Sequence, residues 1–232
     1  MDNIDTRVSK ILLYAGLLGG ALNLADSVRT RGPLRAAALF ALSTGLPAFG
    51  EVLVTGPLKL LRHRTNPRVK GVPVTILLLW YNVICGAHAA TERALNWLPL
   101  TAGQRRETLP PGTALVATSL DLVLDPFGLD AGLWEWKVDG AYATEVRGAN
   151  GRRGVPLLNY LGWVVVVMGV VLGYARLFPR GGSGSRLPAL LLLPHYLASA
   201  GWAVKRRKPG YLLYSALFPA VLYLGTRNEG KG

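Results

Sequence analysis

Four ionisable side chains inside otherwise apolar stretches are the residues best suited to chemistry. His88 and Glu92 are four residues apart, and so are Asp121 and Asp125. Residues with this spacing share one face of a helix. Burial and like-charge repulsion both disfavour two ionised carboxylates side by side, so at least one Asp should stay protonated near neutral pH. A neutral carboxylic acid of this kind can serve as a general acid.

The apolar surroundings favour functional roles for such groups. An ionisable side chain at the centre of a bilayer costs on the order of 2.5 to 3.5 kcal/mol, and the same argument applies to Glu51 and, less convincingly, to His195. Structural alternatives remain for two of them. Asp125 could simply end a helix before a proline, and Glu92 could be an interfacial partner of Arg93.

Aromatic residues cluster near the carboxylates in sequence. Trp134 and Trp136, with Trp97 and Tyr142, could form an interfacial aromatic belt or a wall that stacks on an apolar substrate and steadies a cation. The sequence contains no phosphate-binding glycine loop, dinucleotide fingerprint or Cys/His cluster with metal spacing. We therefore expect neither a metal ion nor another cofactor.

The elements that must position these groups are membrane spans. The chain has 232 residues, of which 50% are hydrophobic, and 26 Lys and Arg against 13 Asp and Glu. The basic residues lie between long apolar runs, which argues against a nucleic-acid binder and favours contact with membrane lipids. A single cysteine, Cys85, excludes a disulfide scaffold.

The apolar segments predict an all-α, polytopic transmembrane helix bundle that forms a single domain over residues 1–232. A span needs about 20 residues. About seven spans are expected, at residues 11–28, 34–61, 72–95, 113–125, 155–177, 187–204 and 211–225. The fourth segment is too short to cross unaided, so we expect a short or broken fourth helix. Glycines and prolines in the second segment predict a kink or break there.

The distribution of charge predicts orientation. Lys and Arg are more numerous in the loops on the N-terminal side, which favours a multi-pass protein of the plasma membrane with a cytoplasmic N-terminus. The stretch before the first span is mixed in sign, so an uncleaved first helix is expected in place of a signal peptide.

Three linked motifs resemble a known family. They are Asp-Leu-Val-Leu-Asp-Pro (residues 121–126), Gly-Leu-Trp-Glu-Trp (132–136) and Gly-Val-Pro-Leu-Leu-Asn-Tyr-Leu-Gly-Trp (154–163). An upstream echo has Thr-Gly (44–45), Phe-Gly (49–50), Gly-Val-Pro (71–73) and Trp80. Together they resemble the integral-membrane carotenoid biosynthesis proteins, in particular the carotenoid hydratases typified by bisanhydrobacterioruberin hydratase.

The resemblance implies a cofactor-independent hydro-lyase that adds water to a terminal C=C bond of an acyclic carotenoid and gives a tertiary alcohol. A protonated Asp would supply the proton, tryptophans would steady the cation, and water would capture it. The catalytic residues implied by the resemblance and the spacing together are Asp121, Asp125, His88, Glu92 and Asn159. The substrate-binding residues are Trp134, Trp136, Glu51, Trp80, Tyr142 and Trp163.

Two other classes of protein fit the same residues. A carotenoid-binding or proton-coupled carrier would use the carboxylates without catalysis. A structural partner of other pigment enzymes would use the high glycine content for close helix packing, as would a homo-oligomer. Residues 126–154 are expected to form a loop that carries the second motif, with residues 143–153 inserted relative to the family pattern.

Overall fold

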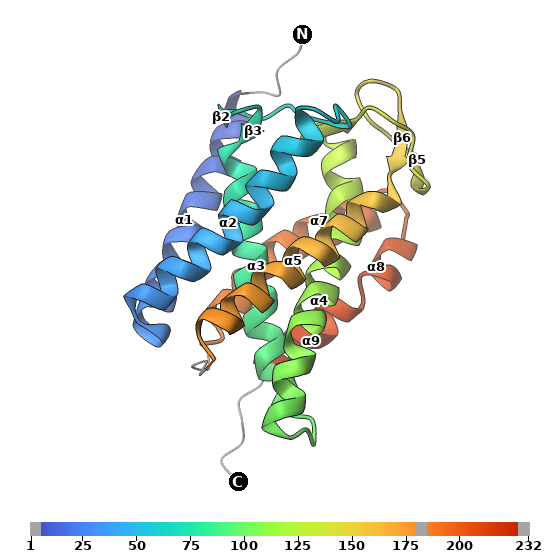
Figure 1. Cartoon of the computed structure of the whole chain (residues 1–232). Helices are drawn as coiled ribbons and strands as arrows, with labels where there is room; N and C mark the ends of the chain where they lie inside the picture. Colours follow the sequence, from blue (N-terminus) through green and yellow to red (C-terminus); the bar gives the residue numbers. More distant parts are fainter. Residues whose placement is uncertain (1–5, 180–184, 227–232) are drawn as a thin grey trace.

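Helices account for most of the chain in the computed structural model, which describes residues 6–179 and 185–226. Six helical segments in this part are long and apolar enough to cross a membrane. The prediction of an all-α polytopic bundle is therefore confirmed (Figure 1). The helices are α1 (Thr6–Arg31), α2 (Pro33–Thr55), α3 (Val74–Leu95), α4 (Ala102–Asp130), α5 (Leu157–Leu177), α6 (Leu187–Leu190), α7 (Leu193–Lys205), α8 (Gly210–Tyr214) and α9 (Leu217–Thr226).

Helices α3 and α4 form the centre of the bundle. Each has 78% of its most apolar stretch buried, against 22% for α1 and 17% for α2. Small residues let other helices approach them closely. Gly86 of α3 lies against Leu192, with no room for a Cβ, and Gly225 of α9 lies against the backbone of Ala90. Such contacts supply the close packing that helices in a membrane require.

The expected short fourth helix is wrong. Helix α4 begins after Thr101, whose hydroxyl accepts a hydrogen bond from Gln104 N while the Gln104 side chain accepts one from Thr101 N. It then continues through Pro110, Pro111 and Pro126. Prolines are tolerated inside a packed membrane helix, because neighbouring groups satisfy the carbonyls they free. The helix has 29 residues and would be about 43 Å long.

Three other expected spans also differ from the prediction, and one of them, at 187–204, is divided into α6 and α7. Helix α2 is one continuous helix through Pro47 and ends at Thr55, and the rest of the expected second span forms a strand and turns. The expected seventh span is divided into α8 and α9, with Ser215 as the C-cap of α8. The last two expected segments are thus broken, and the fourth is continuous.

Three short antiparallel ribbons lie at the end of the bundle shown uppermost in Figure 1. Strands β1 (Leu61–His63) and β4 (Trp134–Trp136) pair so that His63 lies opposite Trp134. The other strands are β2 (Arg68–Val69), β3 (Val72–Pro73), β5 (Tyr142–Arg147) and β6 (Arg153–Val155), paired β2 with β3 and β5 with β6. The expected loop at 126–154 therefore completes α4 and then contributes three strands.

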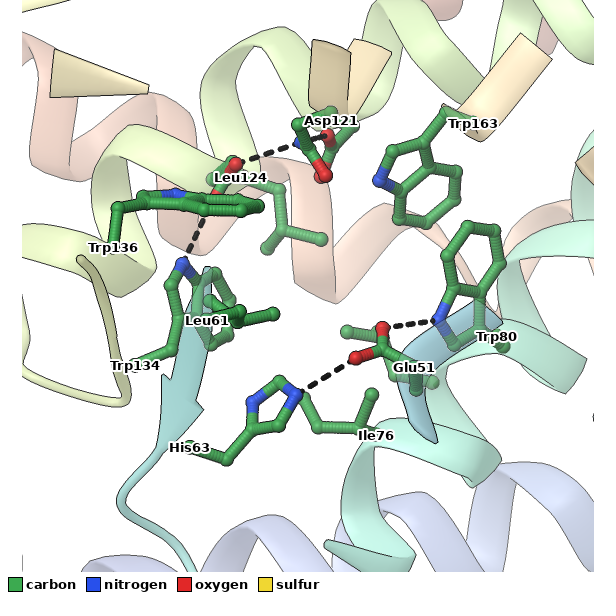
Figure 2. A pocket seen from close by; sticks show the side chains of 13 residues that line it. Glu51, Leu61, His63, Ile76, Trp80, Asp121, Leu124, Trp134, Trp136 and Trp163 are labelled. Carbon is green, nitrogen blue, oxygen red and sulfur yellow. Dashed lines mark hydrogen bonds and ion pairs between the residues drawn. The ribbon is translucent and has the colours of Figure 1, made fainter. Parts of the chain in front are cut away.

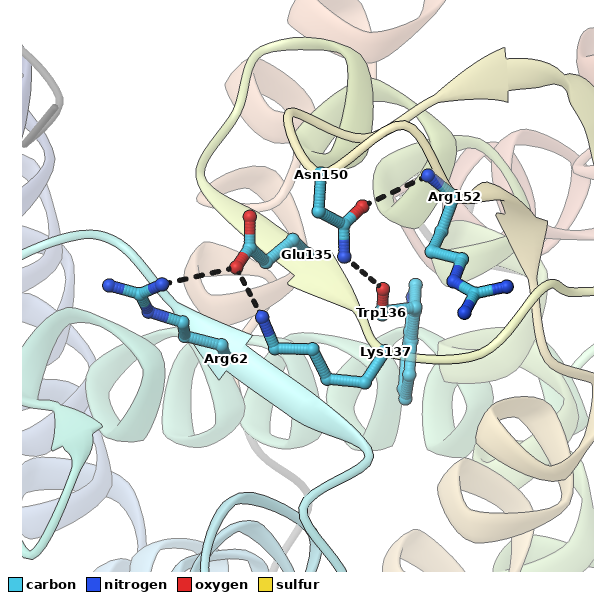
Figure 3. A network of polar contacts seen from close by, with 6 residues as sticks. All are labelled: Arg62, Glu135, Trp136, Lys137, Asn150 and Arg152. Carbon is cyan, nitrogen blue, oxygen red and sulfur yellow. Dashed lines mark hydrogen bonds and ion pairs between the residues drawn. The ribbon is translucent and has the colours of Figure 1, made fainter. Parts of the chain in front are cut away.

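The β5–β6 hairpin, which contains the inserted residues, holds β4 in place (Figure 3). Asn150 Nδ2 donates to the carbonyl oxygen of Trp136 at 2.7 Å, and its own carbonyl accepts from Arg152 N at 3.1 Å. On the other face of β4, Glu135 is bound by Lys137 at 2.7 Å and Arg62 at 3.4 Å. The strand that carries Trp134 and Trp136 is thus fixed from both sides.

Candidate active site

A small chamber of about 40 Å³ brings most of the predicted residues together (Figure 2). Its polar lining combines three carboxylates, a histidine and an asparagine with four tryptophans. The remaining lining is aliphatic, and none of the lining residues in the described part of the chain is Lys or Arg. The full set is Glu51, Asp121, Asp125, His63, Asn159, Trp80, Trp134, Trp136, Trp163, Leu61, Ile76, Leu79 and Leu124.

The two aspartates share one donor. Asn159 Nδ2 donates to Asp121 Oδ2 at 2.9 Å and to Asp125 Oδ2 at 2.8 Å. The indole Nε1 of Trp134 donates to the other oxygen of Asp125. Both Asp side chains are buried, at 4% and 3% exposure. Asp121 and Asp125 therefore form a buried pair whose separation is set by helix spacing and whose orientation is set by Asn159.

Glu51 and His63 face this pair across the chamber (Figure 2). His63 Nε2 lies 2.8 Å from Glu51 Oε2, and Trp80 Nε1 donates to Glu51 Oε1 at 2.9 Å. If Glu51 is a carboxylate, Nε2 carries a hydrogen, and in the neutral imidazole Nδ1 then keeps its lone pair. Within the described residues, the buried Nδ1 has no hydrogen-bond partner. His63 is therefore a candidate base that lies opposite the candidate acids.

Four tryptophans form the walls between these polar groups. Trp80 and Trp163 stack with ring centroids 3.7 Å apart and planes 24° apart. Trp134 and Trp136 reach the chamber from β4, because alternate residues of a strand point to the same side. The resulting surface of aromatic faces suits a flat apolar chain and a short-lived cation.

Three predicted site residues lie elsewhere. His88 and Glu92 line a different cavity with Arg31, whose guanidinium is 3.4 Å from the Glu92 carboxylate. Tyr142 donates to the carbonyl oxygen of Leu122 at 2.8 Å and packs among other tyrosines. The structure therefore does not bring His88, Glu92 or Tyr142 to the chamber that holds the aspartates.

His63 is the chamber residue that the sequence interpretation missed. It lies in the charged connection that follows the second apolar segment. Its 3% exposure results from the pairing of β1 with β4, which is more than 70 residues further along the chain. The buried, exposed, buried pattern of Leu61, Arg62 and His63 is a strand signal, but it covers only three residues. Nothing in so short a pattern identifies Glu51 as the partner.

Two larger apolar chambers adjoin the central one. The α2–α5 chamber, of about 260 Å³, shares Glu51, Trp80, Asn159 and Trp163 among other residues with it. The α1–α7 chamber, of about 280 Å³, shares Ile76, Leu79, Leu124 and Trp134 with it and also contains His195. The two larger chambers have no lining residue in common among those described, and each shares lining residues with the central chamber.

Comparison with known proteins identifies one family. The family model described as "Carotenoid biosynthesis protein" matches residues 17–206, a range that includes every residue lining the central chamber. No curated protein matches the chain, and no solved structure does.

Proposed function

Because the chain belongs to the carotenoid biosynthesis protein family and has a multi-pass helical architecture, we propose that it is a membrane carotenoid hydratase. It adds water across a C=C bond at the acyclic end of a carotenoid, with the terminal bond expected from the motif resemblance. The product is a tertiary alcohol, and the chemistry uses only side chains and water. The observation that carries this proposal is the Asn159-bridged aspartate pair opposite the Glu51–His63 pair.

The first proposed step is protonation of the double bond. One carboxyl of the Asp121–Asp125 pair donates its proton to the less substituted carbon, and the positive charge develops on the tertiary carbon. Asn159 keeps both carboxyl groups directed into the chamber. The new negative charge on the pair is stabilised by the amide of Asn159 and the indole N–H of Trp134.

The tertiary cation is then held against aromatic faces. Trp80, Trp134, Trp136 and Trp163 all line the chamber, and each face attracts positive charge. Glu51 supplies a further negative group on the side away from the aspartates. These contacts stabilise the cation more than the neutral polyene, which is the condition for lowering the barrier.

Capture by water completes the reaction. In the proposed step, a water molecule that reaches the buried Nδ1 of His63 gives up a proton to it while Nε2–H remains bonded to Glu51. The oxygen forms the new C–O bond, and the released proton returns to the aspartate pair. A polar space of about 40 Å³ can hold one or two waters or a few substrate atoms, since about 10 to 15 Å³ suffices for a single water.

Isotope incorporation tests the reaction directly. Membranes containing the full chain, given an acyclic carotenoid in oxygen-18 water, should produce a labelled alcohol. Asp121→Asn and Asp125→Asn should each reduce the rate by about 10²-fold or more, because each removes a carboxyl needed for proton transfer. Asp139→Asn is the matched control, because Asp139 is exposed, pairs with Arg152 and does not line the central chamber. Full activity in both site variants would exclude the mechanism.

The second candidate function is a carotenoid-binding protein or carrier, which the two large apolar chambers favour. Such a protein would retain unmodified pigment and give no labelled alcohol in the same experiment. Proton-linked pigment transfer between vesicles, abolished by Asp121→Asn, would then identify a carrier.

The proposed location is the plasma membrane with a cytoplasmic N-terminus. The strand ribbons at the N-terminal end of the bundle carry basic residues such as Arg62, Arg68 and Lys137, as the positive-inside rule expects for the cytoplasmic side. Labelling of single cysteines introduced at Asn150 and at Gly103, with Cys85 replaced by Ala, tests this orientation. A reagent that cannot cross the membrane should label intact cells only at position 103.

A further inference from the structure

The α1–α7 chamber is much larger than a terminal double bond requires. Two methyl groups are all that lies beyond the outermost double bond of an acyclic isoprenoid end. A buried cavity of about 150 Å³ can hold benzene, which has six carbons. By proportion, the chamber of about 280 Å³ has room for about ten carbons, or two isoprene units.

The α2–α5 chamber suits the long arm of a polyene. Its lining includes the stacked Trp80 and Trp163 and also Leu158, which is 63% exposed, so the chamber reaches the surface of the helices. A Cβ at Gly162 would meet no atom within 4 Å. This open space at the helix surface gives a long apolar chain a way in from the bilayer.

Resting on the hydration proposed above, we infer that the carotenoid passes through the central chamber. Its long arm lies in the α2–α5 chamber and its end lies in the α1–α7 chamber. The depth of the α1–α7 chamber then determines which double bond faces Asp121 and Asp125. A filled chamber places a bond up to about two isoprene units from the end at the carboxylates. The addition is unchanged: the π bond and one water O–H bond break, and one C–H and one C–O bond form.

Filling the α1–α7 chamber tests this assignment. Ala198 lines the chamber from α7, and its neighbour Leu197 is 57% exposed and does not line it. In Ala198→Phe the chain end should stop earlier, so the hydroxyl should move toward the outermost double bond. The rate at the inner bond should fall about tenfold, which corresponds to about 1.4 kcal/mol. Leu197→Phe should give the product of the unmodified chain.

A second filling variant guards against a folding defect. Ala15 lines the same chamber from α1, so Ala15→Phe should move the hydroxyl in the same direction as Ala198→Phe. Mass spectrometry of the product locates the hydroxyl in each case. The inference is overturned if both filling variants and the unmodified chain place the hydroxyl at the same bond.

The long arm is tested separately by pigment binding. In an Asp121→Asn background, Gly162→Leu should weaken retention of an acyclic carotenoid about tenfold, because the new side chain enters the α2–α5 chamber. Gly45→Leu is the matched control, since a Cβ there also meets no atom within 4 Å and the residue lines none of the three chambers. Equal retention in the two variants would overturn the placement of the long arm.

Failure of this inference can be distinguished from failure of the proposed function. If the unmodified chain gives no alcohol, the hydratase proposal fails, and pigment retention still decides the chain path. Weaker retention in Ala198→Phe than in Leu197→Phe then supports passage through the central chamber, and equal retention contradicts it. If alcohol forms at an unchanged position in all variants, the hydratase proposal stands and the chain path is wrong.

Discussion

Gly128 lies directly against the indole of Trp134, with no space between them for a Cβ. Trp134 is held there by its hydrogen bond to Asp125, one turn earlier on α4. The glycine therefore sets how closely β4 can approach the helix that carries the aspartates. The position of a proposed catalytic carboxyl thus depends on the absence of a side chain on the next turn.

Gly128→Ala should disable the site by moving Trp134. The added methyl group forces the indole away from α4, which breaks its bond to Asp125 and shifts the aromatic wall. A misplacement of about 1 Å can cost about 10²-fold in rate, and overpacking costs about 1 to 3 kcal/mol in stability. Hydration rate and tryptophan fluorescence measure the two effects. Gly201→Ala, with open space at its Cβ, should change neither.

Asn159→Ala should lower the hydration rate while leaving the helices intact. The amide is the donor that both aspartates share, and a hydrogen bond to a charged group contributes about 1.5 to 3 kcal/mol. Losing it should slow proton transfer about tenfold or more. Asn159→Asp keeps the size of the side chain but replaces the amide donor with a further carboxyl beside the aspartate pair. Its hydration rate should be lower still than that of Asn159→Ala. Rates equal to the unmodified chain in both variants would contradict the bridging role.

His63→Ala should slow water capture and respond to added imidazole. General-base catalysis contributes about 10² to 10⁴-fold, so a loss in that range is expected. A small imidazole can enter the space left by the side chain and accept the proton in its place. Recovery of rate with imidazole but not with an equal concentration of pyrrole would identify a base. Failure of imidazole to restore any activity in a correctly folded variant would argue for a purely structural His63.

Asn150→Ala should destabilise the cap, by which we mean the β1–β4, β2–β3 and β5–β6 ribbons at the end of the bundle. Its amide donates to the carbonyl oxygen of Trp136, and a neutral hydrogen bond contributes about 0.5 to 1.5 kcal/mol. We expect a lower unfolding temperature and a modest loss of activity. Asn150→Asp keeps the acceptor for Arg152 N but loses the donor to Trp136. If Asp behaves like Asn, the Trp136 contact contributes nothing.

Acid should weaken the same cap through Glu135. Burial by itself would raise the pKa of this carboxyl, but the hydrogen bond and charge of Lys137, with the charges of Arg62 and Arg64, outweigh it and lower the pKa below 4.5. A depressed folded-state pKa stabilises the protein above about pH 4.5, and this stabilisation is lost as the pH falls below that value. The difference in unfolding temperature between the unmodified chain and Glu135→Gln should therefore shrink from pH 7 to pH 3. A constant difference would exclude this ionisation as the cause.

The aspartate pair could be predicted from the sequence because local spacing determines it, whereas Asn159 was predicted only through the resemblance of its motif to the carotenoid biosynthesis proteins. Asp121 and Asp125 are one helical turn apart whatever surrounds them, and the motif that contains Asn159 follows at the start of the next long helix. The same spacing holds for His88 and Glu92, yet these residues line another cavity. Spacing determines which side chains share a helix face, but it does not determine which cavity that face lines. His88 lies eight residues, or about 12 Å, along α3 from Trp80, which lines the central chamber.

Contacts between distant segments explain what the sequence could not predict. His63 reaches the chamber only because β1 pairs with β4. The sequence pattern of a three-residue strand is too short to predict that pairing. The expected fourth span starts only at residue 113, because the stretch before it holds charged residues and turn formers, among them Pro110 and Pro111. Their cost depends on neighbouring helices that satisfy the freed carbonyls, and this information lies outside the segment.

If the proposed hydration holds, the β1–β4 ribbon is the boundary at which water and the apolar substrate meet. It contributes His63 on one strand and Trp134 and Trp136 on the other, and it closes the end of the bundle where Asp125 lies about 7 Å from the end of α4. In the proposed reaction, water approaches from the ribbon side and the carotenoid approaches from the bilayer. A ribbon of three paired residues in each strand therefore separates water from lipid at this point. The product can return its hydroxyl to the aqueous side while its chain stays in lipid.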